Sequence, residues 1–139
     1  MAWIAANINR LMTVSGVLTV TMIYALFAPE AALQSNFGES LSGPVASIVV
    51  RNWGALLALV GGMLIYGART PAVRPLVLTV ATSSKVVFIA LVLSHGGRYL
   101  SQRVGIAVVV DVIWIALFGL YLLRSSREGA SATSAARVP

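Results

Sequence analysis

Four long runs of apolar residues divide the chain, at about 11–28, 48–68, 76–94 and 104–123. Each run is close to the ~20 residues that a helix needs to cross a hydrocarbon core of roughly 30 Å. None shows the apolar–polar alternation of short barrel strands. Helices are therefore expected, because a helix satisfies its own backbone hydrogen bonds in lipid. The pattern predicts an all-α fold, a four-helix transmembrane bundle within residues 1–124.

The polar stretches between the runs predict different connections. The longest, 29–47, predicts a longer outer loop between the first two helices, with room for a short interfacial helix. The stretch 69–75 contains two prolines and two arginines, which predicts a tight turn. Residues 125–139 are mostly small and polar, and we expect a flexible C-terminal tail there. The first apolar run exceeds the 7–15 residues usual in a signal peptide, so we expect it to remain as a helix.

Composition supports a membrane environment. Hydrophobic residues make up 58% of the chain and charged residues only 10%, and the mean hydropathy is +0.90. A soluble domain carries about 25% charged residues. The net charge is +6, but the basic residues lie between and beside the apolar runs, which argues against a nucleic-acid partner. With no cysteine, one histidine and four acidic residues, we expect no metal site and no cofactor.

Basic residues also predict the orientation of the helices. With four crossings, both termini lie on the same side of the membrane. The terminal side contains Arg10, Arg69, Arg74, Arg124, Arg127 and Arg137, and the opposite side contains Arg51, Arg98 and Arg103. The positive-inside rule then places both termini in the cytoplasm, an N-in, C-in arrangement. We expect the membrane to be a bacterial inner membrane.

Charged residues within the apolar runs are the main candidates for chemistry. Lys85 lies in the third predicted helix and Asp111 in the fourth, at depths that let their side chains meet. Arg51 enters the second helix near the same surface, so we expect a cluster of Arg51, Lys85 and Asp111 with one excess positive charge. Such a cluster has two interpretations. It neutralises itself and fixes helix register, or it handles an anion, a proton or a partner's carboxylate.

Two further groups of residues predict a cavity wall and a packed helix face. Thr82, Ser84, Trp114 and Phe118 lie near the two charges in sequence, and either pack the bundle or line an apolar cavity with Asp111 at its polar end. In the second helix, Gly54, Ala58 and Gly62 recur every four residues. This small-residue pattern predicts close packing against another helix, within the bundle or between two copies of the chain.

Four short motifs occupy the middle of the chain: Arg51-Asn52-Trp53-Gly54, Gly61-Gly62, the Arg/Pro turn and Ser84-Lys85. In these motifs the chain resembles small four-helix bacterial membrane proteins of the DoxX-like type. Some DoxX proteins are subunits of quinone-linked membrane oxidoreductases, so the resemblance implies a membrane partner. It assigns no catalytic residue.

Three functions follow from these patterns. Our first interpretation is a non-enzymatic accessory or assembly subunit of a membrane complex, in contact with lipids and with other subunits or itself. The second is a small ion or proton channel or transporter that uses Lys85 and Asp111. The third is a lipid- or quinone-binding membrane protein. The chain has no nucleophile elbow, phosphate loop or metalloprotease pattern, so we expect no enzyme activity.

Overall fold

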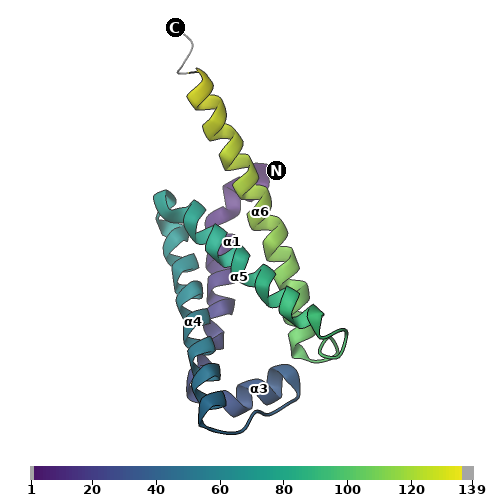
Figure 1. Ribbon diagram of the computed structural model, residues 1–139. Helices are drawn as coiled ribbons and strands as arrows, with labels where there is room; N and C mark the ends of the chain where they lie inside the picture. The colour runs from purple at the N-terminus through teal and green to yellow at the C-terminus, as the bar shows by residue number, and fades with distance from the viewer. Residues whose placement is uncertain (1, 136–139) are drawn as a thin grey trace.

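The computed structural model describes residues 2–135, and throughout these residues the regular structure is helical, with no strand. This confirms the all-α prediction. In chain order the elements are α1 (Ala2–Val20), η1 (Thr21–Ile23), α2 (Tyr24–Phe27), α3 (Pro29–Phe37), α4 (Pro44–Arg69), η2 (Pro71–Val73), α5 (Arg74–Ser94) and α6 (Arg103–Ala135). Figure 1 shows these helices along the chain.

Four helical spans are long enough and apolar enough to cross a membrane: Trp3–Phe27, Pro44–Arg69, Pro71–Ser94 and Arg103–Arg127. Their 24 to 26 residues correspond to about 36–39 Å of helix, more than the roughly 30 Å of a bilayer core. Large apolar side chains lie exposed on their outer surfaces, as lipid-facing helices require. These properties are those of a multi-pass integral membrane protein.

Proline and glycine set the ends of several helices. Pro29 and Pro44 stand in the first turns of α3 and α4, where a missing backbone N–H costs nothing. Gly38 ends α3 with a φ of 71°, the left-handed conformation that glycine adopts most easily. At the far end, α6 continues to Ala135, into the segment for which the sequence predicted a flexible tail. The rest of that segment, 136–139, lies outside the described residues.

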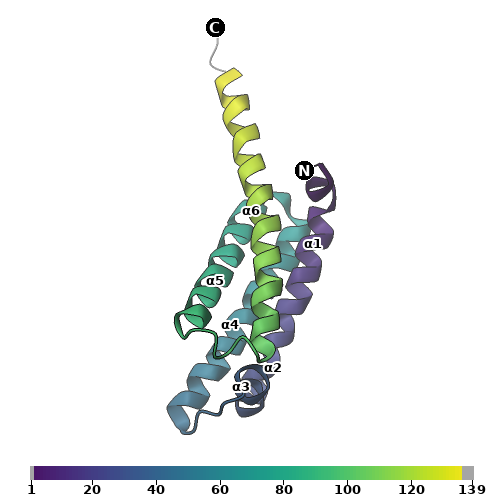
Figure 2. The same ribbon diagram turned by 90° about the vertical axis from the view of Figure 1, so that its right-hand side faces the viewer.

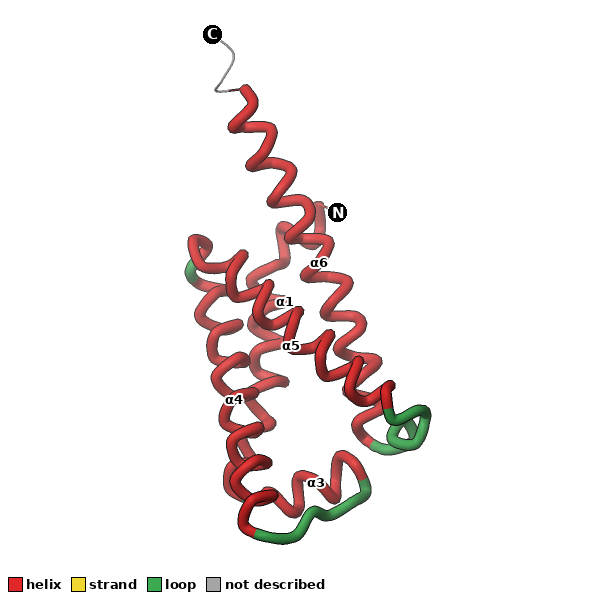
Figure 3. Tube along the Cα trace, in the orientation of Figure 1, coloured by secondary structure: helices red, strands yellow, loops and turns green. Residues whose placement is uncertain are grey.

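Among the four long helices, α1 packs most extensively against α4, and α5 packs against both α6 and α4. Both termini lie at one end of the bundle, with the short turn η2 (Figures 1 and 2). From that turn α4 and α5 diverge, and α3 lies at the wider end, as Figure 1 shows. The longer non-helical connections, drawn green in Figure 3, also lie at this wider end.

Close packing of α1 and α2 against α4 depends on glycines. A side chain added at Gly61 would lie 2.7 Å from the carbonyl oxygen of Gly16 in α1, and one added at Gly54 would lie 2.8 Å from Ala25 in α2. Gly62 has open space around it, and Ala58 is half-buried. The predicted packing face of Gly54, Ala58 and Gly62 is therefore only partly correct.

Helix geometry explains this correction. Seven residues bring the helix almost back to the same face, about 20° short, whereas eight residues carry it about 80° past. Gly61 therefore shares the packed face of Gly54, and Gly62 has turned away from it.

The largest apolar cluster among the described residues joins the four long helices. Its fully buried members include Met12 of α1, Leu64 of α4, Leu78 of α5 and Phe118 of α6. Because each helix contributes a side chain to this cluster, the cluster holds the four helices together at the end nearer the termini.

Candidate functional site

Lys85 of α5 and Asp111 of α6 form an ion pair inside the bundle, as the sequence predicted. Their side chains are only 12% and 15% exposed. The pairing follows from the hairpin geometry, because Lys85 lies nine residues before the end of α5 and Asp111 lies eight residues after the start of α6. At 1.5 Å per residue, both lie about 12–14 Å from the turn that joins the two helices.

Arg51 does not join this pair. Its guanidinium donates to the backbone carbonyl of Leu26 at 2.6 Å and to the Ser47 hydroxyl at 3.2 Å, and its side chain is exposed. The face of α4 that carries Arg51 is directed toward the end of α2 rather than toward α6. The predicted three-member cluster with an excess positive charge is therefore wrong. Lys85 and Asp111 balance each other.

Trp114 and Phe118 pack the core instead of lining a cavity. Their rings are stacked at 5.5 Å with 27° between the planes, and they are 9% and 0% exposed. Ser84 is half-buried, and the buried Thr82 hydroxyl has no hydrogen-bond partner among the described residues. For Trp114 and Phe118, the contacts therefore support packing of the bundle rather than the wall of a cavity.

Arg74 is a buried charged residue whose role the sequence analysis missed. Its guanidinium donates to Asn9 Oδ1 at 2.7 Å, to the carbonyls of Ala68 at 3.2 Å and Gly67 at 3.4 Å, and to the Tyr121 hydroxyl at 3.4 Å. The two carbonyls belong to the last turn of α4, where a cation is favourable. Arg74 therefore links its own helix, α5, to α1, α4 and α6.

A signal for Arg74 was present in the sequence. Arg74 directly follows a proline turn, and Asn9 is a polar residue near the start of the first helix. From the sequence alone, Arg74 counts only as a charge that sets orientation. Recognising the contact required knowing that the starts of the first and third predicted helices lie side by side.

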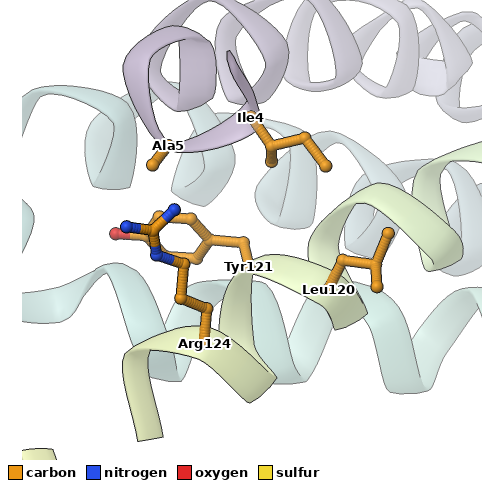
Figure 4. Close-up of a pocket in the computed structure, with 5 residues that line it drawn as sticks. All are labelled: Ile4, Ala5, Leu120, Tyr121 and Arg124. Carbon is orange, nitrogen blue, oxygen red and sulfur yellow. The ribbon is translucent and has the colours of Figure 1, made fainter. Parts of the chain in front are cut away.

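A small pocket lies near Arg74, between α1 and α6. Figure 4 shows Ile4 and Ala5 on one side and Leu120, Tyr121 and Arg124 on the other. Its volume of about 10 Å³ suits a single water molecule. The pocket is too small for an organic ligand.

A much larger groove opens at the other end of the bundle, where α4 and α5 diverge. Its volume is about 440 Å³. Nearly all of its wall is apolar. On the side of α3 and α4 the apolar residues are Leu33, Phe37, Leu41, Val49, Val50 and Trp53. On α5 they are Phe88, Leu91 and Val92. The sequence carries no signal for this groove, because the groove depends on the divergence of two helices rather than on a motif.

Polar groups gather at one end of this groove. Glu39 and Arg98 form an exposed ion pair, and the Tyr99 hydroxyl donates to Glu39 Oε2 at 3.3 Å. His95 also lines the groove. An apolar groove with a few polar groups at one end can hold the apolar part of an amphiphile and contact its polar part. Over the described residues, no three His, Cys, Asp or Glu side chains gather as metal ligands.

Comparisons with known proteins identify no relative of this chain. The chain has no significant match to a protein-family model, to a curated protein or to a solved structure. The DoxX-like resemblance stays a prediction, and the function must be inferred from the geometry of the chain itself.

Proposed function

We propose that this protein is a non-enzymatic membrane protein that binds one amphiphilic lipid-like molecule, with its tail in the groove between α4 and α5. The observation that carries the proposal is the groove itself. Its 440 Å³ lies within the roughly 300–1,000 Å³ typical of ligand sites, and its polar groups lie at one end. Of the three functions that the sequence left open, this geometry favours the third.

The ion pair gives less support to transport. Lys85 and Asp111 neutralise each other, and Arg51 adds no charge beside them. A buried pair of this kind commonly fixes the register of two helices. We therefore assign the pair to the α5–α6 hairpin rather than to an ion path.

Trp53 provides a direct test, because it lines the groove and the chain contains only three tryptophans. In a Trp3→Phe/Trp114→Phe background, Trp53 is the only tryptophan. Lipids with brominated acyl chains are titrated into the protein in mild detergent. We expect Trp53 fluorescence to be quenched with saturation, since bound lipid places bromine beside the ring.

A matched pair of double variants makes this test specific. Val49→Phe/Leu91→Phe fills the groove, and we expect at least tenfold weaker quenching by lipid. Leu59→Phe/Val87→Phe adds the same rings to exposed positions of α4 and α5 that do not line the groove, and should behave like the parent. Quenching without saturation, or equal quenching in both double variants, would contradict the proposal.

An accessory role remains our second candidate, favoured by the open surface at Gly62. A glycine with nothing near it on an apolar helix lets a second helix approach closely. We expect Gly62→Leu to reduce co-purification with a partner, or self-association, in mild detergent, and Gly97→Leu in the α5–α6 connection, which also has open space, to leave it unchanged. Equal association in both variants would remove this surface from consideration.

We further propose the inner membrane as the location, with both termini in the cytoplasm. The positive-inside rule supports this orientation. Because the chain has no cysteine, single cysteines can be introduced for labelling. We expect Ser42→Cys to react with a membrane-impermeant maleimide from outside the cytoplasm and Ser126→Cys only after lysis. The reverse pattern would invert the topology.

A further inference from the structure

Selection among amphiphiles must come from the polar end of the groove. Lipid tails are about as apolar as the groove wall, so moving a tail from the bilayer into the groove gains little free energy. Any lipid tail would therefore be accepted with similar free energy. Glu39, His95 and Tyr99 are the polar residues that line the groove. Arg98 lies beside them through its ion pair with Glu39.

Glu39 is an acceptor that a ligand can reach. Its side chain and that of Arg98 are 47% and 70% exposed, so the pair is weak and open to exchange. The Tyr99 hydroxyl already donates its hydrogen to Glu39, which leaves no donor on Tyr99 for a ligand. At this point the groove offers a carboxylate with a guanidinium directly beside it.

His95 adds a second acceptor, as its hydrogen bonds indicate. The Ser94 hydroxyl donates to the Leu91 carbonyl at 2.7 Å, so its hydrogen is not available to His95. His95 Nδ1 lies 3.0 Å from the same carbonyl and 3.2 Å from the Ser94 oxygen. Both neighbours are acceptors, which assigns the hydrogen of the neutral ring to Nδ1 and leaves Nε2 as an acceptor.

We infer that the occupant of the groove is a phospholipid with a primary ammonium, as in phosphatidylethanolamine. This inference rests on the proposed function and specifies its ligand. The ammonium would donate to Glu39 and to His95 Nε2, and the phosphate would accept from Arg98. A primary ammonium has three N–H donors, which suits an end of the groove that offers two acceptors beside one cation.

The aromatic residues at this end do not favour choline instead. A quaternary ammonium is recognised by open aromatic faces. The Tyr99 ring lies beneath the Arg98 guanidinium at 5.4 Å, and Phe37 meets it edge to face at 5.7 Å. Arg98 and Phe37 therefore already contact the Tyr99 ring, which leaves no open aromatic face there for a ligand. The groups that remain for a ligand are the hydrogen-bond acceptors of Glu39 and His95.

The test compares brominated phosphatidylethanolamine, phosphatidylcholine and phosphatidylglycerol with the same acyl chains, using Trp53 quenching in the background described above. We expect at least fivefold tighter binding of phosphatidylethanolamine. Glu39→Gln should abolish this preference, and His95→Ala should reduce it. Glu30→Gln is the matched control, because Glu30 is an exposed acid of α3 that does not line the groove, and it should keep the preference.

The possible outcomes separate the inference from the proposed function. Saturable quenching that is equal for the three lipids would overturn the ammonium inference and leave lipid binding intact. Preference for phosphatidylcholine or phosphatidylglycerol would overturn it too, in favour of cation–π or anion recognition. Full displacement of phosphatidylethanolamine by a short-chain quinol at equal concentration would identify a quinol site instead. Absence of saturable quenching by every lipid would overturn the proposed function itself.

Discussion

Replacing one or both members of the Lys85–Asp111 pair is the sharpest test of how this bundle is stabilised. The variants are Lys85→Met, Asp111→Leu and the double variant. Each single change leaves one charge about 12–14 Å along its helix from the connecting turn, within the apolar part of the bundle. The double change leaves two apolar side chains of similar size that can pack against each other.

The expected magnitudes differ strongly between single and double variants. Two unit charges 4 Å apart attract by about 4 kcal/mol at an effective dielectric constant of 20. Removing one partner of a buried pair costs about 3–5 kcal/mol, because the other charge stays buried without compensation. Replacing both is close to neutral, and in other proteins has stabilised by about 1–4 kcal/mol. We therefore expect both single variants to be much less stable than the double variant.

Reversible unfolding in mixed micelles, titrated with sodium dodecyl sulfate, measures these free energies. Circular dichroism follows loss of helix. In a Trp3→Phe/Trp53→Phe background, the fluorescence of the remaining Trp114 reports on the neighbourhood of Asp111, three residues away in α6. Single variants as stable as the parent would refute the reasoning, because they would show that the charges are not buried together. A double variant as unstable as the single ones would show that the pair has a role beyond mutual neutralisation.

Three further predictions concern packing, and the same unfolding assay checks each. Gly61→Ala should lower the free energy of unfolding by about 1–3 kcal/mol, because the added methyl group overpacks the contact with α1. Gly62→Ala adds the same group in open space and should change that free energy by less than about 1 kcal/mol. Equal effects of the two substitutions would refute the assignment of the packed face. Arg74→Met should lower the free energy of unfolding by about 2 kcal/mol or more, because it removes charged hydrogen bonds. Arg69→Met, at an exposed position, should lower it by about 0.5 kcal/mol or less. Phe118→Ala should cost about 3–5 kcal/mol, and a cost under about 1 kcal/mol would mean that it lines a cavity after all.

Features that depend on distance along one helix could be predicted from the sequence. The four spans follow from the length of apolar runs, and the meeting of Lys85 with Asp111 follows from counting residues on either side of a short turn. Both are properties of neighbouring segments. Their geometry is nearly determined by the rise per residue, so little knowledge of the tertiary structure was needed.

Features that depend on rotation or tilt of helices could not be predicted in the same way. Gly61 and Gly62 are adjacent in sequence but differ by about 100° in direction, so choosing between them requires the partner helix. Arg51 has the right depth for the ion pair but lies on another face of the bundle. The groove depends on how far α4 and α5 diverge, and no motif encodes that divergence.

Arg74 also has a consequence for how the protein is assembled in the membrane. Its acceptors on Gly67 and Ala68 lie seven and six residues earlier in the chain, and Asn9 belongs to the first helix to be synthesised. Three of its four bonds can therefore form before α6 leaves the ribosome, and only the bond to Tyr121 must wait. Most hydrogen bonds of the arginine are thus within reach early during biogenesis, and the arrival of the last helix completes them.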